Sequence, residues 1–390
     1  MTKRLLVGLF LFAAPAFAQL DPLRNVSGTT QHIGGAPWVT NSSGAWTFFH
    51  ALSAHVTQVS ETGPEEQNNE VFSTNWLAAG AHRHVGERAF VLLRGRVSLE
   101  PVTIADNAGY PQMLQFVSAE SGGVLVDRMR PHDFLGEAAL QAGWRPSAST
   151  LVHLYVAAVG DPALGAAPFA LRASGADFAE APFAYDVQEP SHDATRVVTL
   201  GFASRLFALE GSVFHEAVTF DDHTEIDDGD IDSSSVRVTL TPTPNLAIQV
   251  SRGTLGEDAA EREVSTASLT YGTTNIAATA LWTRREREGD PTQTAYGIEL
   301  TLRGARHTAM ARAEWVDRPL GFPDVVSSTT TEQTTHFAVG YIWDFISRPR
   351  LRAGAGVNID YHTQSHELPA RYGHKPQSIY AFVRVRSAGY

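Results

Sequence analysis

The stretch from Tyr296 to Trp315, YGIELTLRGARHTAMARAEW, decides the fold class of this chain. Apolar and polar side chains alternate along it, so an extended strand would carry one apolar face and one charged face. The apolar face holds Tyr296, Ile298, Leu300 and Leu302, and the other face holds Glu299, Thr301 and Arg303. After residues 304–307 the alternation resumes and places Arg312 and Glu314 opposite alanines. The stretch therefore predicts a β-hairpin whose two faces differ in character.

Two classes of β-protein use such faces. A soluble sandwich buries the apolar face, whereas a membrane barrel turns it to lipid and turns the charged face to its lumen. The beginning of the chain favours the barrel, because Lys3 and Arg4 precede the apolar run 5–14 and residues 16–18 read Ala-Phe-Ala. This pattern predicts a secretory signal peptide over residues 1–18. We therefore expect an exported protein that begins at Gln19.

The composition excludes several classes of protein. The chain has 390 residues, no cysteine and a net charge of −12, so disulfides and thiolate metal sites are excluded. A mean hydropathy of −0.13, without an apolar run of about 18 residues in the mature chain, excludes a helical membrane protein. The acidic charge argues against nucleic-acid partners, and the sequence has neither a phosphate-binding glycine loop nor a serine nucleophile motif. We expect no cofactor.

The alternation returns along the chain from about Trp46 onward. Short connections alternate with long ones, which is typical of outer-membrane barrels with short periplasmic turns and long extracellular loops. The count of strands predicts an all-β fold, a single closed antiparallel transmembrane β-barrel of about 16 strands (about 14 to 18). We assign residues 46–390 to this barrel. Residues 19–45 lack any period and predict an irregular N-terminal segment, either periplasmic or plug-like.

Several motifs resemble a family of uncharacterised bacterial outer-membrane barrels. They are Ser98–Val102 with Gly109–Pro111, Val126–Asp133, Gly160–Gly165 and Pro242–Asn245. The resemblance spans most of the mature chain and implies the barrel fold and the outer membrane, without implying an activity. Members of the family carry a His-Pro-His-Asp motif and methionine and histidine near the mature N-terminus. Here Arg130 replaces the first histidine of that motif and the N-terminal segment has only His32, so the family's histidine pattern is incomplete.

The charged residues that alternate away from lipid are the candidate pore lining. A barrel of about 16 strands is too wide for its own side chains to fill, and opposed charges on its walls would create a selective constriction. The predicted pore-lining residues are Arg94, Arg96, Glu100, Arg237, Glu299, Arg303, Arg312, Glu314, Arg352 and Asp360. The alternative is that these charges pair into networks that fill a closed interior.

Two further groups have weaker patterns. Arg128, Arg130, His132 and Asp133 predict a loop that folds inward and constricts the channel. His132 and Asp133 are adjacent and would point to opposite faces of a strand, so we expect them to anchor the loop rather than to form a catalytic pair. His82 and His84 share a strand face and could bind a metal ion, but no third ligand is placed by the sequence, so a surface pair is favoured.

Together these patterns predict a porin-like channel for passive passage of small polar or charged solutes across the cell outer membrane. One alternative is a closed structural, ligand-binding or metal-binding barrel, and a less favoured one is an outer-membrane hydrolase. We expect the chain not to be an enzyme. The expected partners are outer-membrane lipid and lipopolysaccharide, the barrel-assembly machinery, small solutes and other copies of the chain in a homo-oligomer.

Overall fold

The structure is a computed structural model that describes most of the chain. The described residues are 20–35, 37–62, 70–104, 109–118, 124–189, 191–216, 223–256, 261–318, 332–364, 372 and 376–387. The predicted signal peptide and the predicted mature start at Gln19 lie outside these residues.

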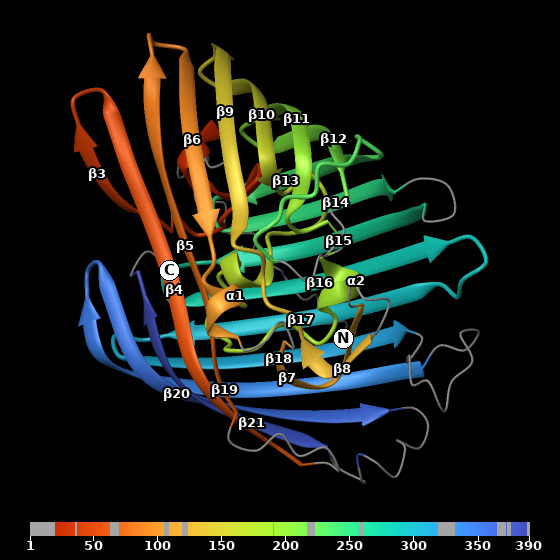
Figure 1. The fold of residues 1–390 in the computed structure, drawn as a ribbon. Helices are drawn as coiled ribbons and strands as arrows, with labels where there is room; N and C mark the ends of the chain where they lie inside the picture. Colours follow the sequence, from red (N-terminus) through yellow and green to blue (C-terminus); the bar gives the residue numbers. More distant parts are fainter. Residues whose placement is uncertain are drawn as a thin grey trace, which may run out of the picture.

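Sixteen antiparallel strands close into one barrel (Figure 1). They are β4 (Trp46–Glu61), β5 (Glu70–Val85), β6 (Ala89–Val97), β9 (Leu135–Ser147), β10 (Thr150–Gly160), β11 (Ala194–Ser204), β12 (Phe207–His215), β13 (Ser233–Thr243), β14 (Leu246–Leu255), β15 (Arg262–Gly272), β16 (Ile276–Arg287), β17 (Gln293–Arg303), β18 (His307–Arg318), β19 (Glu332–Arg348), β20 (Leu351–Gln364) and β21 (Gln377–Arg386). The predicted all-β fold and strand number are confirmed.

Strand β4 closes the barrel by pairing with two partners. Its residues 53–61 pair with β21, and its residues 46–50 pair with the short strand β3 (Val39–Ser43). The barrel sheet thus includes residues before Trp46, because β3 continues the sheet where β21 ends. Full closure leaves no exposed sheet edge between the first and last strands.

The hairpin that decided the fold class is β17 and β18, and its faces are oriented as predicted. Leu300 is 36% exposed on the outer surface, whereas Thr301 is fully buried inside. Large apolar side chains such as Ile298, Val339 and Ile359 are likewise exposed on the outside. An apolar outer face on a closed sheet is the arrangement that places a barrel in lipid. No helix among the described residues is long and apolar enough to cross a membrane.

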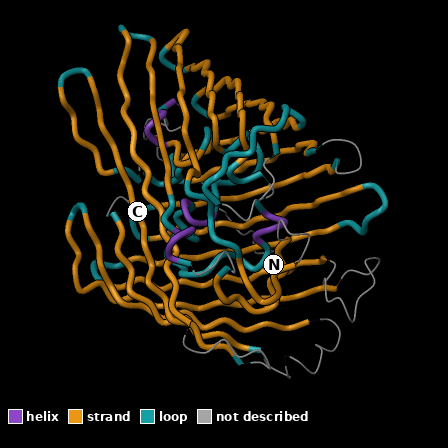
Figure 2. Tube along the Cα trace, in the orientation of Figure 1, coloured by secondary structure: helices purple, strands orange, loops and turns teal. Residues whose placement is uncertain are grey.

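Three segments of the chain lie inside the barrel (Figure 2). The N-terminal segment (residues 20–35) contains the turn of 3-10 helix η2 (Pro22–Arg24) and strands β1 (Asn25–Ser27) and β2 (Thr30–Gln31). The hairpin insert (residues 98–104, 109–118 and 124–133 of the described chain) contains α1 (Glu100–Thr103), β7 (Tyr110–Ser118) and β8 (Val124–Met129). The long insert (residues 161–189 and 191–193) contains η4 (Phe169–Leu171) and α2 (Tyr185–Gln188). These segments carry much of the buried core, including Phe183 and Val187.

The two inserts explain most of the motifs that resemble the outer-membrane family. Ser98–Val102 leads into α1, Gly109–Pro111 begins β7, and Val126–Asp133 forms the end of the hairpin insert. Gly160–Gly165 begins the long insert, and Pro242–Asn245 forms the end of β13 and the short turn that follows it. All but the last of these motifs therefore build the interior rather than the wall.

Candidate functional site

The long insert is bound to the far wall of the barrel by buried ion pairs. Arg172 of the insert donates to Glu299 of β17, with Nε 2.8 Å from Oε2 and Nη2 2.9 Å from Oε1. Ser174 donates to the same carboxylate at 2.8 Å. Burial alone would lower the pKa of Arg172, but Glu299 holds it above its usual value. The pair therefore stays charged inside the barrel.

Asp177, further along the insert, neutralises a group of wall arginines. Its Oδ2 lies 2.8 Å from Arg303 Nη2, and its Oδ1 lies 3.3 Å from Arg386 Nη1 and also accepts from Arg384. Burial alone would raise the pKa of Asp177, but these guanidinium groups hold it well below its usual range. The predicted lumenal charge of Arg303 is thus paired with the insert.

Glu180, the next acidic residue of the insert, also contacts side chains of the wall. Glu180 accepts from Asn358 Nδ2 at 2.6 Å and lies 3.7 Å from Arg312 Nη1. Burial and the charge of Asp360 raise the pKa of Glu180 to about 8. The raised pKa means that the Glu180 carboxyl favours its uncharged form, because a second acidic group lies close by in a buried site.

Two of the predicted lumenal acids are joined through a histidine that the sequence analysis did not select. His336 Nδ1 lies 2.8 Å from Glu314 Oε2, and its Nε2 lies 3.1 Å from Asp360 Oδ2. Glu314 also accepts from the backbone N–H groups of Phe183 and Ala184 at 2.9 and 3.0 Å. The insert therefore docks its backbone, as well as its side chains, on the wall.

The N-terminal segment is held differently. Arg94 donates to the carbonyls of Asn25 and Gly28 at 2.7 and 2.6 Å, but it also pairs with Glu137 of β9, Nε to Oε2, at 2.7 Å. Arg237 and Glu210 form a second wall pair at 2.8 Å. The segment thus contacts wall charges that already have partners of opposite charge on the wall.

Arg237 donates to the hydroxyls of Thr29 and Thr30, and Arg96 donates to Ser27 Oγ. A cavity of about 60 Å³ lies between this segment and the short-turn ends of β9 to β16. Its lining combines neutral polar groups such as Gln249 and Thr279 with charged ones, among them Glu210 and Arg237.

The hairpin insert carries the residues predicted to constrict the channel. His132 Nδ1 and its backbone N lie 2.8 and 2.7 Å from Glu100 Oε2, and Asp133 Oδ1 lies 2.7 Å from His223 Nδ1. Arg128 pairs with Glu70 at 3.0 Å. Burial raises the pKa of Tyr185 of the long insert well above its usual value, and the nearby Arg130 opposes that rise. Burial alone would lower the pKa of His132, but Glu100 raises it to about 9.

Glu100 does not lie on the barrel wall. It was predicted to follow Arg94 and Arg96 along one strand, but β6 ends at Val97 and Glu100 begins α1. The alternation of exposed and buried side chains continues past the end of the strand. Leu99 is exposed, and Glu100 points inward, where it contacts His132 and accepts from the backbone N–H of Asn75.

The remaining predicted wall residues face the interior. All of them except Arg352 are nine-tenths or more buried beneath the N-terminal segment or the inserts. The buried residues are Arg94, Arg96, Arg237, Glu299, Arg303, Arg312, Glu314 and Asp360. Arg352 lies at the short-turn rim, where it donates to the carbonyls of Gly304 and Ala305. Their role in lining a pore stays a prediction.

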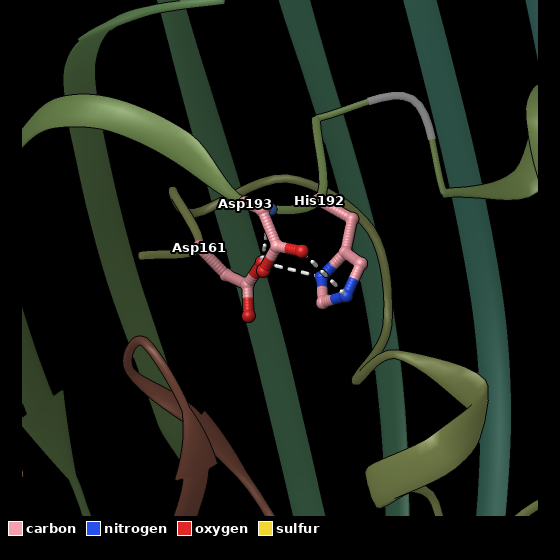
Figure 3. Close-up of side chains that lie close together, drawn as sticks. All are labelled: Asp161, His192 and Asp193. Atoms are coloured by element: carbon pink, nitrogen blue, oxygen red, sulfur yellow. Dashed lines mark hydrogen bonds and ion pairs between the residues drawn. The ribbon is translucent and has the colours of Figure 1, made fainter. Parts of the chain in front are cut away.

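His82 and His84, the weak metal candidates, have ring centroids 4.8 Å apart. Within the described residues, a single group of three metal-ligating side chains meets closely, and it is elsewhere: Asp161, His192 and Asp193 (Figure 3). His192 Nδ1 lies 2.9 Å from Asp161 Oδ1, and its Nε2 lies 3.4 Å from Asp193 Oδ2. No short spacing in the sequence indicates this group, because its members lie at opposite ends of the long insert.

Comparison with known proteins shows the fold. No family of protein sequences and no curated protein matches the chain. Among solved structures, OmpT, an outer membrane protein of Vibrio cholerae, covers 89% of this chain and 99% of its own at 9% identity and a TM-score of 0.51. This chain has the fold of a porin-type outer-membrane barrel. Two porins share this fold. Salmonella typhi OmpF is 7% identical, with 89% of this chain and 100% of OmpF covered and a TM-score of 0.50. An anion-selective porin from Comamonas acidovorans is 10% identical, with 87% of this chain and 99% of that porin covered and a TM-score of 0.50.

The porin-type barrel fold and the apolar outer face both indicate that the chain lies in the outer membrane. A closed sheet exposes no unpaired backbone groups to lipid, and its outer face carries apolar side chains such as Leu300 and Val339. The chain is therefore an outer-membrane barrel, as predicted.

Proposed function

We propose that this porin-type barrel is a channel for small polar or charged solutes, with a lumen narrowed by its inserts. The observation that supports the proposal is the width of the closed sheet, because barrels of 16 strands are too wide to be filled by their own side chains. Its inner wall carries many charged and polar side chains, which suits a polar path. The buried Arg94 and Arg237 and the acids Glu299 and Glu314 would then face any open path.

The way in which the interior is filled suggests which part moves. The long insert makes ion pairs that its withdrawal would break, leaving the wall charges Glu299 and Arg303 with fewer partners in a buried site. The N-terminal segment makes hydrogen bonds to Arg94 and Arg237, whose charges are balanced by Glu137 and Glu210 on the wall. Its withdrawal would leave no unpaired buried charge at these sites. We take the N-terminal segment as a removable plug and the long insert as a fixed constriction.

In this proposal the hairpin insert is part of the constriction. Arg128, His132 and Asp133 each hold it to a different neighbour, namely Glu70, Glu100 and His223. Such anchoring fits the role of a loop that narrows the channel without taking part in chemistry. That the chain is not an enzyme stays a prediction.

A second candidate, a closed barrel, is favoured by one observation. Most of the predicted lining is 5% exposed or less, which is what a filled interior requires. Recording single-channel currents from folded full-length protein in planar bilayers separates the two candidates. Discrete conductance steps support the channel, and a bilayer that contains folded barrels but stays silent supports the closed barrel.

The partners expected of such a channel are lipopolysaccharide and outer-membrane lipid on its apolar face, and the barrel-assembly machinery during insertion. A homo-oligomer is also part of the proposal, since one structure of the V. cholerae OmpT is described as its trimer form. Light scattering of the detergent-solubilised protein measures the number of copies. A monomer in several mild detergents would remove this part of the proposal.

A further inference from the structure

The neck of the long insert brings three ligand side chains together. Asp161 directly follows β10, and His192 and Asp193 directly precede β11. Gly160 and Ala194 are paired across these two strands, so the sheet holds Asp161 and Asp193 opposite each other just beyond the ladder. Figure 3 shows the two carboxylates next to each other, with the imidazole of His192 beside them. The backbone register therefore fixes the group independently of the rest of the insert.

The distances suit a tetrahedral metal ion. One ligand atom from each residue lies within 4.8 Å of the others. Zinc bonds of about 2.0 to 2.2 Å to nitrogen and oxygen put tetrahedral ligand atoms roughly 3.3 Å apart. Closing the group around an ion thus needs shifts of up to about 1.5 Å, within the reach of side-chain rotation. Two carboxylates and one imidazole would leave a fourth position for water.

An unsatisfied oxygen is a second observation that points to a cation. Asp161 is only 7% exposed, yet its Oδ2 accepts no hydrogen bond; the nearest cation, Arg96 Nη2, is 3.6 Å away. Buried carboxylate oxygens normally have a partner. With a neutral imidazole on His192, the two carboxylates exceed the positive charge of Arg96. His132, whose ring centroid lies 5.6 Å from that of His192, is already paired with Glu100, so the group has room for more positive charge.

The surroundings already hold the two carboxylates in place. Arg96 Nη2 donates to Asp193 Oδ1 at 2.8 Å, and the backbone N–H of Asp193 donates to Asp161 Oδ1 at 3.2 Å. Partners of this kind orient ligands in metal sites. The imidazole and the small number of oxygens disfavour calcium, which takes six to eight oxygen ligands.

We propose that Asp161, His192 and Asp193 bind one divalent transition-metal ion of the zinc type. The bound ion cross-links the two ends of the long insert and fixes its position in the lumen. This inference does not depend on whether the barrel conducts.

Isothermal titration of untagged, folded full-length protein with zinc chloride, after treatment with a chelator, tests the site. We expect one equivalent of zinc to bind at micromolar concentration or below. His192→Ala and Asp161→Asn should each weaken binding at least tenfold, while a matched control with both His82→Ala and His84→Ala should bind as the wild type does. No binding to the wild type, or equal binding to His192→Ala, overturns the proposal, as does loss of binding in the control.

A second measurement needs no variant and so does not depend on variants that fold. Cobalt(II) added to the wild type should give the intense visible absorption of a tetrahedral site, and one equivalent of zinc should abolish it. A spectrum that stays that of hydrated octahedral cobalt contradicts the proposed ligand set.

Discussion

Arg172 and Glu299 form a two-point ion pair across the interior of the barrel, with both side chains at least 96% buried. A bidentate guanidinium–carboxylate pair fixes orientation as well as distance. It joins the long insert to β17, a strand distant from β10 and β11 in the order of the barrel. The relationship gives the first prediction.

Arg172→Ala should destabilise the folded barrel by about 3 to 5 kcal/mol, because it removes the two-point ion pair of the buried Glu299 and leaves it the hydroxyl of Ser174 and the guanidinium of Arg312, at 3.4 Å. The matched control is Arg252→Ala, which removes an exposed pair with Glu263 and should cost less than about 1 kcal/mol. Urea unfolding in lipid vesicles measures both. Equal losses of stability would show that the insert is not held by this pair.

The lipid-facing wall gives the second prediction. Leu300→Arg should destabilise the barrel by about 2 to 4 kcal/mol if it lies near the membrane midplane, because it places a charge in hydrocarbon. Ala305→Arg, in the exposed short turn after β17, is the control and should assemble normally. Thr301→Arg should also disturb assembly, since Thr301 is fully buried and donates to the carbonyl of Ser174. Normal folding of Leu300→Arg would mean that the outer face is wrongly assigned.

The Glu100–His132 pair predicts a pH dependence of stability. The pKa of His132 is about 9 when folded and 6.5 in the ordinary state, so protonation favours the folded form. Its contribution, on the order of 3 kcal/mol, should be fully present below pH 6.5 and lost as the pH rises through about 9. The unfolding free energy of the wild type minus that of His132→Gln, measured from pH 5 to 10, reports it. In a Glu100→Gln background this pH-dependent difference should vanish, and its persistence there would assign it to another group.

The sequence predicted the wall much better than the interior. Side chains on a strand alternate between two environments, so the outward Leu300 and the inward Glu299 were readable from their period alone. No periodic pattern indicates that Arg172 and Asp177 are buried, because irregular segments inside a barrel do not alternate apolar and polar side chains. From the sequence, their partners Glu299 and Arg303 could be recognised only as inward-facing charges of the wall with no identified partner.

The metal-ligating group at the neck of the long insert was hidden for a related reason. Asp161 and His192 are 31 residues apart and meet only because β10 and β11 pair. A sequence scan for ligands at short spacing instead selected His82 and His84, which are neighbours on one strand. The signal that could have found the group is the pair of strands that flanks the insert.

Orientation gives the fourth prediction. The long connections, including the one between β12 and β13, should face the cell exterior, and the short turns should face the periplasm. A peptide epitope inserted between Asp228 and Gly229 should therefore bind antibody on intact cells, whereas an epitope inserted after Ala305 should need permeabilised cells. The reverse staining pattern would invert the assigned topology.

The last prediction concerns the N-terminal segment as a removable plug, and it has two parts. Removing residues 20–35 should leave the barrel closed, because β3 and β21 complete the sheet without them. It should raise the single-channel conductance, because the segment occupies the lumen beside Arg94 and Arg237. Gel shift on heating checks that the shortened protein is folded. A folded shortened barrel with unchanged conductance would show that this segment does not block the path.

In the shortened barrel the wall charges should set ion selectivity. Arg94→Gln leaves Glu137 without the guanidinium that now lies 2.7 Å from it, so the opened path becomes more negative. The reversal potential in a salt gradient should therefore shift toward cations, and more at low salt, where charges are screened less. Arg252→Gln, on an exposed position of β14, is the matched control and should leave the potential unchanged. If both variants behave alike, Arg94 does not lie beside the conducting path.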